Sequence, residues 1–159
     1  MTRLHLFAKS TGFTAKTSPG LVDSLLSLPR SFILAGLAGS LSLVVYLVTI
    51  APDLSWSNFS SDGAELISAS VTMGIAHPPG YPTYILLGKL FSLLPLGTVA
   101  FRYNVFSAIA MASAVAFSTA TTYASNPAAK SNWSAVLSAG LTFAFAPLIW
   151  SQATIAEVY

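Results

Sequence analysis

Three long apolar windows divide the chain, and each is long enough to cross a membrane as a helix. They cover residues 32–51, 103–124 and 134–153, and none of them contains Lys, Arg, Asp or Glu. A hydrocarbon core about 30 Å thick needs about 20 helical residues, and the Ser and Thr hydroxyls within the windows can bond to the preceding helical turn. The pattern predicts an all-α membrane protein with three transmembrane helices.

The segment between the first two windows, residues 52–102, is expected to carry two short helices along the membrane surface. Residues 62–75 place apolar side chains on one face of a helix, and the Gly and Pro residues that follow end it. Residues 83–94 form a second apolar stretch that is too short to span a bilayer and is interrupted by Lys89. A re-entrant or tilted half-span is the alternative for this second stretch.

Small residues recur at helical spacing inside the first two windows. Ala35 with Gly39, and Gly36 with Ser40, form two such faces in the first window, and Ala108, Ala112 and Ala116 form one in the second. Small side chains let two helix backbones approach closely within a membrane. We therefore expect the first two spans to pack against each other, although membrane helices are in general rich in Ala and Gly.

The composition agrees with a membrane protein: 54% of the residues are hydrophobic, 8% are charged and the mean hydropathy is +0.71. Residues 1–30 are too polar to fold alone and are predicted to be a disordered tail, with residues 21–28 as a candidate interfacial helix. The Lys and Arg excess in this tail predicts a cytosolic N-terminus and an outer, lumenal position for residues 52–102. The first window is longer than the apolar core of most signal peptides, which favours a retained anchor over a cleaved one.

The outer segment concentrates the ionisable groups that can carry chemistry. Asp62 and Glu65 lie one helical turn apart, so the two carboxylates can share a proton, a metal or a substrate hydroxyl, and Asp62 can act as a general base. The alternative is a capping box, in which both carboxylates only satisfy free N–H groups at the start of a helix. Spacing alone favours the capping box.

Three further side chains are candidates for binding a substrate. His77 precedes two prolines that hold its backbone extended, so it either binds a phosphate or orients a carboxylate, or it faces water in a turn. Lys89 and Arg102 can neutralise a phosphate, although Arg102 can equally be an interfacial residue. With His5 in the tail as the second of two histidines, a metal cluster is not expected; no cofactor is predicted, and a need for a divalent metal stays open. The net charge is only +2, so there is no reason to expect the clustered basic face that nucleic-acid-binding proteins usually carry.

The helical pattern of residues 152–159 runs to the last residue without a terminator, which favours the N-terminal part of a larger helical bundle over a complete three-span protein. Residues 31–159 would then be the N-terminal part of that membrane domain.

Several motifs along the chain point to one family. They are Asp62 to Leu66, Gly74 to Pro82, Leu86 to Phe91, Arg102 to Asn104, Trp150, and Ala156 to Tyr159. Over residues 45–159 they resemble the DUF2723 family of GT-C type glycosyltransferases, which includes transmembrane protein 260.

The resemblance implies an O-mannosyltransferase of the endoplasmic reticulum membrane. Such an enzyme transfers mannose from a dolichyl-phosphate donor to Ser or Thr of a lumenal protein. The related protein O-mannosyltransferases carry an adjacent Asp-Glu pair, whereas Gly63 and Ala64 intervene here. Asp62 therefore carries over as the catalytic base more securely than Glu65 does as a second catalytic carboxylate.

The resemblance also places His77 and Arg102 near the leaving phosphate, with Lys89 as a further phosphate ligand. Residues 83–94 would dock the lipid chain. The 159-residue chain, as a fragment of the full enzyme, is expected to be inactive on its own. A non-catalytic membrane scaffold or lipid-binding subunit is the alternative. A transporter is less favoured, because the predicted spans carry no formal charge.

Overall fold

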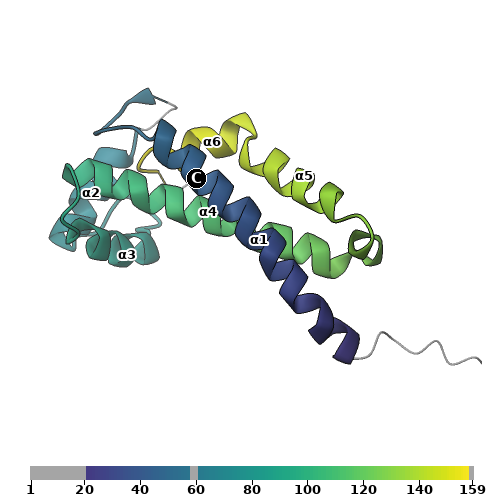
Figure 1. Cartoon of the computed structure of the whole chain (residues 1–159). Helices are drawn as coiled ribbons and strands as arrows, with labels where there is room; N and C mark the ends of the chain where they lie inside the picture. The colour runs from purple at the N-terminus through teal and green to yellow at the C-terminus, as the bar shows by residue number, and fades with distance from the viewer. Residues whose placement is uncertain (1–20, 58–60, 158–159) are drawn as a thin grey trace, which may run out of the picture.

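Two long helices, packed side by side, form the body of the molecule in the computed structural model (Figure 1). The structure describes residues 21–57 and 61–157, with side chains from residue 30 onward, and these residues contain helices and no strand. Helix α1 covers Leu21–Thr49 and α4 covers Val99–Ser125. The segments Arg30–Thr49 and Val99–Ser125 are each long and apolar enough to cross a membrane, which confirms an all-α membrane protein.

Helix α1 starts earlier than the first apolar window. It begins at Leu21 and runs without a break to Thr49, so residues 21–28 are helical, as the sequence predicted, and the predicted disordered tail does not include residues 21–30. Extending an existing helix costs less free energy than starting a new one, and the apolar span supplies the helix to extend. Residues 1–20, including His5, lie outside the described part of the chain.

The third apolar window is bent instead of straight. Helix α5 (Trp133–Ala144) and helix α6 (Pro147–Ala153) meet at an angle of 63°. Pro147 causes the break, because a residue that precedes proline is pushed out of the helical conformation, and Ala146 accordingly has a ψ of 134°. The chain therefore has two candidate spans, or three if this bent pair is one.

The predicted contact between the first two spans is present, and one of the two small-residue faces makes it. A Cβ atom added to Gly39 would lie 3.0 Å from the carbonyl oxygen of Ala112 and 3.0 Å from the Cβ of Ala116, whereas one added to Gly36 would meet nothing within 4 Å. Gly39 thus allows α1 to approach α4 closely. Gly36 itself takes no part in this contact.

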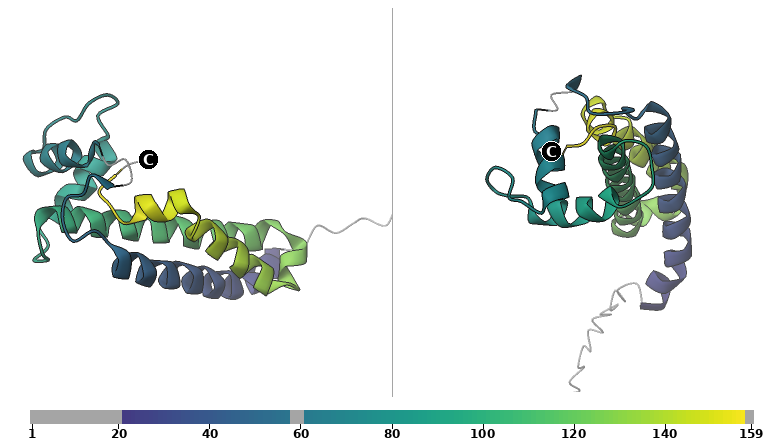
Figure 2. Two further views of the ribbon diagram at one scale, coloured as in Figure 1. Left: turned by 90° about the horizontal axis from the view of Figure 1, so that it is seen from above. Right: turned by 90° about the vertical axis from the view of Figure 1, so that its left-hand side faces the viewer.

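The segment between α1 and α4 forms two short helices at one end of the long pair (Figure 2). Helix α2 covers Gly63–Thr72 and α3 covers Pro82–Ser92, each close to its predicted range. Their shared core consists of Leu66, Ala69, Ala76 and Ile85. At the opposite end, the 3-10 helix η2 (Pro127–Lys130) connects α4 to α5.

The two short helices are tied to each other and to α4 by a buried polar contact and a close approach. The hydroxyl of Ser70 donates to the carbonyl oxygen of Ile85 at 2.7 Å, joining α2 to α3. A Cβ atom on Gly88 would overlap the ring of Tyr103 at 2.5 Å, so α3 lies directly on the first turns of α4. This packing fixes the position of the turn between α2 and α3.

Candidate functional site

His77 lies between the carboxylate of Asp62, at the N-cap of α2, and the carboxylate of Glu65, in the first turn of α2. Its backbone N–H donates to Oε1 of Glu65 at 2.7 Å, and its ring Nδ1 lies 3.1 Å from Oε2 of the same side chain. On the other side of the ring, Nε2 lies 3.7 Å from Oδ2 of Asp62. The three side chains are a quarter to a half exposed, so a ligand can reach them from solvent.

The turn that carries His77 has a distinctive backbone. The N–H of Gly80 donates to the carbonyl oxygen of His77 at 2.8 Å and closes the turn. Gly80 has a φ of 86° and Tyr81 a φ of 44°; glycine accepts such values readily, whereas for tyrosine they are unusual. The ring of Tyr81 packs edge-on against His77, with ring centroids 5.3 Å apart, and so restricts the imidazole from a second side.

The capping box favoured by spacing is absent. Asp62 does stand at the N-cap position of α2, but its backbone is in the helical region, with φ −97° and ψ −11°, and its side chain caps no helix N–H. Its Oδ1 accepts a hydrogen bond from the hydroxyl of Ser61 at 3.1 Å instead. The carboxylate of Glu65 is directed to His77. The prediction of a capping pair is therefore wrong, because the turn twelve residues further on competes for Glu65.

The two predicted cationic ligands bind backbone carbonyls at the ends of helices. The ammonium group of Lys89 donates to the carbonyl oxygen of Val71 at 2.6 Å, in the last turn of α2. The guanidinium of Arg102 donates to three carbonyl oxygens around the end of α3, those of Ser92 at 2.6 Å, Leu96 at 2.7 Å and Gly97 at 3.3 Å. Both cations thus occupy positions where a helix C-terminus favours positive charge.

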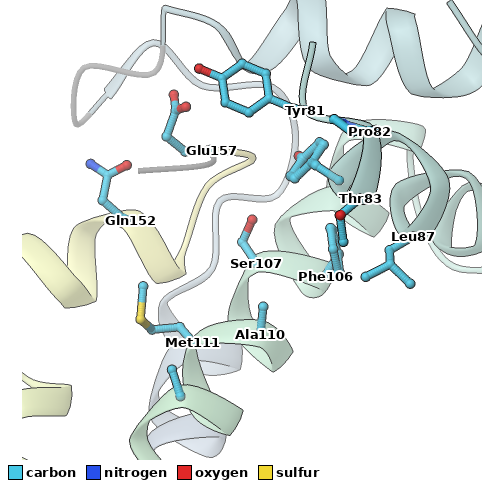
Figure 3. A pocket seen from close by; sticks show the side chains of 12 residues that line it. Tyr81, Pro82, Thr83, Leu87, Phe106, Ser107, Ala110, Met111, Gln152 and Glu157 are labelled. Carbon is cyan, nitrogen blue, oxygen red and sulfur yellow. The ribbon is translucent and has the colours of Figure 1, made fainter. Parts of the chain in front are cut away.

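A cavity of about 570 Å³ opens beside the His77 turn (Figure 3). Tyr81 connects the two features, since its ring packs on His77 and also lines the cavity. The wall is mainly apolar, with polar groups contributed by Tyr84, Ser107 and the C-terminal segment. The remaining lining residues are Pro82, Thr83, Leu87, Phe106, Ala110, Met111, Ala114, Gln152 and Glu157.

The polar groups of this cavity were not selected as site residues from the sequence. Glu157 is 8% exposed, and among the described residues the buried hydroxyls of Tyr84 and Ser107 have no hydrogen-bond partner. Burial, with Tyr103 and the charge of Glu157 nearby, raises the pKa of Tyr84 above its usual value. The signal for Glu157 was present, because an acidic residue beside an apolar helix invites a functional explanation.

Within residues 21–57 and 61–157, no three side chains of His, Cys, Asp and Glu lie in an arrangement that could hold a metal ion. Asp62, Glu65 and His77 form a hydrogen-bonded carboxylate and imidazole pair with a second carboxylate close by. Such a group can accept a proton from a hydroxyl and can stabilise a neighbouring charge. These are properties of a polar site that can support acid and base chemistry.

Fold and site together define a membrane protein in which two short helices hold a carboxylate and histidine cluster beside an apolar cavity. The chain belongs to the family described as "Protein O-mannosyl-transferase TMEM260 N-terminal domain", whose model matches residues 62–159. The match begins at Asp62 and includes Glu65, His77, Lys89 and Arg102.

Two curated relatives support this membership. "Protein O-mannosyl-transferase TMEM260" of Mus musculus is 38% identical over 101 residues, which is 62% of this chain and 14% of the relative. "Protein O-mannosyl-transferase tmem260" of Dictyostelium discoideum is 34% identical over 121 residues, which is 73% of this chain and 14% of the relative. The chain thus spans about one seventh of the length of these relatives. No solved structure matches it.

Proposed function

We propose that this chain is part of an O-mannosyltransferase of the GT-C type in the endoplasmic reticulum membrane. In this proposal the N-terminus is cytosolic and α2 and α3 face the lumen. The donor is mannose on dolichyl phosphate, and the acceptor is a Ser or Thr hydroxyl of a lumenal protein. The names of the curated relatives support the reaction type, and the observation that carries the proposal is the position of His77 between Asp62 and Glu65 beside the cavity.

Asp62 is the proposed catalytic base. The acceptor oxygen attacks the anomeric carbon of mannose, the bond from that carbon to the phosphate oxygen breaks, and dolichyl phosphate leaves with the bonding electrons. The hydroxyl proton passes to the Asp62 carboxylate as the new bond forms. Asp62 is suited to this role because its Oδ2 lies 3.7 Å from Nε2 of the His77 ring, so the imidazole can orient the carboxylate toward the acceptor hydroxyl.

Glu65 and His77 act as a pair in this proposal. The two contacts between them, at 2.7 and 3.1 Å, fix both the backbone and the ring of His77. Glu65 is thereby a positioning residue, and His77 presents its second ring nitrogen toward Asp62. This division gives Asp62 and Glu65 different functions although they lie on one helical turn.

Lys89 and Arg102 are the proposed partners of the leaving phosphate. Each cation contacts carbonyl oxygens of the chain, so phosphate binding requires that a carbonyl contact is exchanged for a phosphate oxygen. A phosphate carries more charge than a carbonyl and makes stronger hydrogen bonds to Arg and Lys. The apolar wall of the cavity, with α3 along it, is the proposed place for the lipid chain nearest the phosphate.

The test is transfer of mannose by a chimera in which this chain replaces the matching N-terminal segment of the mouse relative. We expect Asp62→Asn to lower turnover by at least about 100-fold, as loss of a general base typically does. The matched control is Asp53→Asn. Asp53 is a carboxylate at the same end of the bundle whose Oδ1 accepts from the Thr98 hydroxyl at 3.1 Å.

Expression level and melting temperature of each chimera are measured alongside turnover. Full turnover in Asp62→Asn with normal expression would remove Asp62 as the base. A well-expressed parent chimera that transfers no mannose would contradict the proposed activity and favour a non-catalytic lipid-binding subunit. Glu65→Gln should reduce turnover less than Asp62→Asn, because the amide oxygen still accepts the N–H of His77.

A further inference from the structure

A second pocket lies at the end of the bundle away from the Asp62 site. It has a volume of about 560 Å³ and is formed where the middle of α1, from Arg30 to Leu37, approaches the end of α4, η2 and the start of α5. The left view of Figure 2 shows the connection from α4 to α5 near the N-terminal, purple half of α1. The proposed mannose transfer uses none of these residues.

The floor and walls of this pocket are apolar and aromatic. Leu34 and Tyr123 are buried in a small core with Ala129 and Val136, and they form the bottom of the pocket. Trp133 lines it as well, with 59% of its surface exposed. A tryptophan with an apolar ring and one N–H group is characteristic of the boundary between membrane and water.

The rim of the pocket carries two positive charges. Arg30 and Lys130 line it from α1 and η2, two elements that are far apart in sequence. The acidic side chains that the structure describes all lie at the other end of the bundle and are Asp53, Asp62, Glu65 and Glu157. Arg30 and Lys130 are the charged residues among those that line the pocket.

The cations of the pocket lie at the ends of the two candidate spans. Arg30 is the first residue of one candidate span, and Ser125 is the last residue of the other, only five positions before Lys130. The apolar residues of the pocket thus belong to the spans and its cations to their boundary. Basic pockets between membrane helices bind the headgroups of anionic lipids.

We propose that this pocket binds one anionic phospholipid. Its phosphate lies between Arg30 and Lys130, and an acyl chain lies along Leu34 and Leu37 of α1. The charge of the pocket selects an anion, and the apolar wall selects a lipid over a soluble phosphate. The site is independent of the proposed transferase activity, because it is assembled from the opposite ends of α1 and α4.

The test uses Trp133 as a reporter. A variant of this chain with Trp56→Phe and Trp150→Phe keeps Trp133 alone and is placed in phosphatidylcholine nanodiscs. Phosphatidylserine with brominated acyl chains is titrated in, and quenching of the Trp133 fluorescence is compared with that by brominated phosphatidylcholine. A second variant that keeps only Trp150, at the other end of the bundle, reports the general quenching by lipid.

We expect brominated phosphatidylserine to quench Trp133 at lower mole fraction than brominated phosphatidylcholine, with no such preference for Trp150. Removing one charge, in Arg30→Gln or Lys130→Gln, should weaken this preference about fivefold, in line with the usual contribution of one base near an anionic surface. Arg30→Lys and Lys130→Arg should keep it, and circular dichroism checks that each variant retains its helix content.

Three results would overturn the proposal. One is equal quenching of Trp133 by the charged and the neutral lipid. Another is a preference that the two Gln variants leave unchanged. The third is displacement of the brominated lipid by millimolar inorganic phosphate, which would make the pocket a soluble phosphate site instead of a lipid site.

Discussion

The side chain of Glu65 holds His77 at two points, the backbone N–H at 2.7 Å and the ring Nδ1 at 3.1 Å. The two residues are twelve positions apart and belong to α2 and to the turn before α3. A single carboxylate therefore fixes both the path of the turn and the direction of the imidazole. The contact thus adds a second constraint on the turn to the rigidity of Pro78 and Pro79.

Replacing Glu65 by alanine should destabilise the turn. Glu65→Ala removes both contacts, and because the side chain is half exposed we expect the free energy of unfolding to fall by about 1 kcal/mol. Glu65→Gln should cost less, since its amide oxygen can still accept from the His77 N–H. Chemical denaturation in detergent measures the free energy of unfolding of both variants. If Glu65→Ala is as stable as the parent chain, the turn does not depend on the Glu65 contacts.

Arg102→Lys should be destabilising although it keeps the positive charge. The guanidinium donates to three carbonyl oxygens around the end of α3, and one ammonium group cannot reproduce this planar arrangement. We expect a loss of about 1–2 kcal/mol in the free energy of unfolding. If Arg102→Lys keeps the stability of the parent chain but loses mannose transfer in the chimera, Arg102 contributes mainly through the phosphate.

Gly140→Ala should disrupt the contact between α4 and α5. A Cβ atom there would overlap the hydroxyl oxygen of Thr119, and overpacking of this kind costs about 1–3 kcal/mol. The matched control is Gly36→Ala, where a Cβ atom meets nothing within 4 Å. That control should be neutral or should stabilise α1 by up to about 1 kcal/mol through helix propensity. Melting temperatures in detergent compare the two, and similar values would contradict the close contact.

Tyr84→Phe should not destabilise the chain at neutral pH. The buried hydroxyl of Tyr84 has no hydrogen-bond partner among the described residues, so its removal relieves a cost of about 1 kcal/mol or more. Burial raises the pKa of Tyr84 from 10.0. The folded chain thus holds this proton more tightly than the unfolded chain. Its contribution to stability is complete below pH 10 and is lost as the pH rises further.

Unfolding experiments between pH 8 and pH 11 test the sign of this dependence. The parent chain should lose stability above about pH 10, and Tyr84→Phe should lose less over the same range. If the stability of both proteins falls equally with pH, a group other than Tyr84 causes the loss. A large destabilisation by Tyr84→Phe at pH 7 would show that the hydroxyl has a favourable contact after all.

The apolar windows predicted the long helices because a membrane-spanning helix requires about 20 consecutive, mainly apolar residues, a pattern that can be read directly along the sequence. Windows 32–51 and 103–124 correspond to parts of α1 and α4. The bend in the third window depends on one residue, Pro147, inside an otherwise uninterrupted apolar run. The mean hydropathy of a 20-residue window does not register a single proline. The restriction that Pro147 places on Ala146 can nevertheless be predicted from the sequence.

The site was less predictable, because its contacts join distant positions. Spacing alone made Asp62 and Glu65 a capping pair, and only the fold shows that the turn at His77 reaches Glu65. The same holds for Lys89 and Arg102, whose carbonyl partners lie 18 and up to 10 positions away. No local rule indicates such partners, since they depend on how α2 and α3 pack.

The bend at Pro147 has a consequence for how related sequences vary. In a continuous helix the carbonyl oxygen of Ala144 would accept from the backbone four residues on, whereas here it accepts from the hydroxyl of Tyr46 on α1 at 2.8 Å. Loss of that donor would leave a polar atom exposed to an apolar surrounding. Positions 46 and 147 should therefore change together among relatives, so that a straight third helix accompanies a residue 46 without a hydroxyl group.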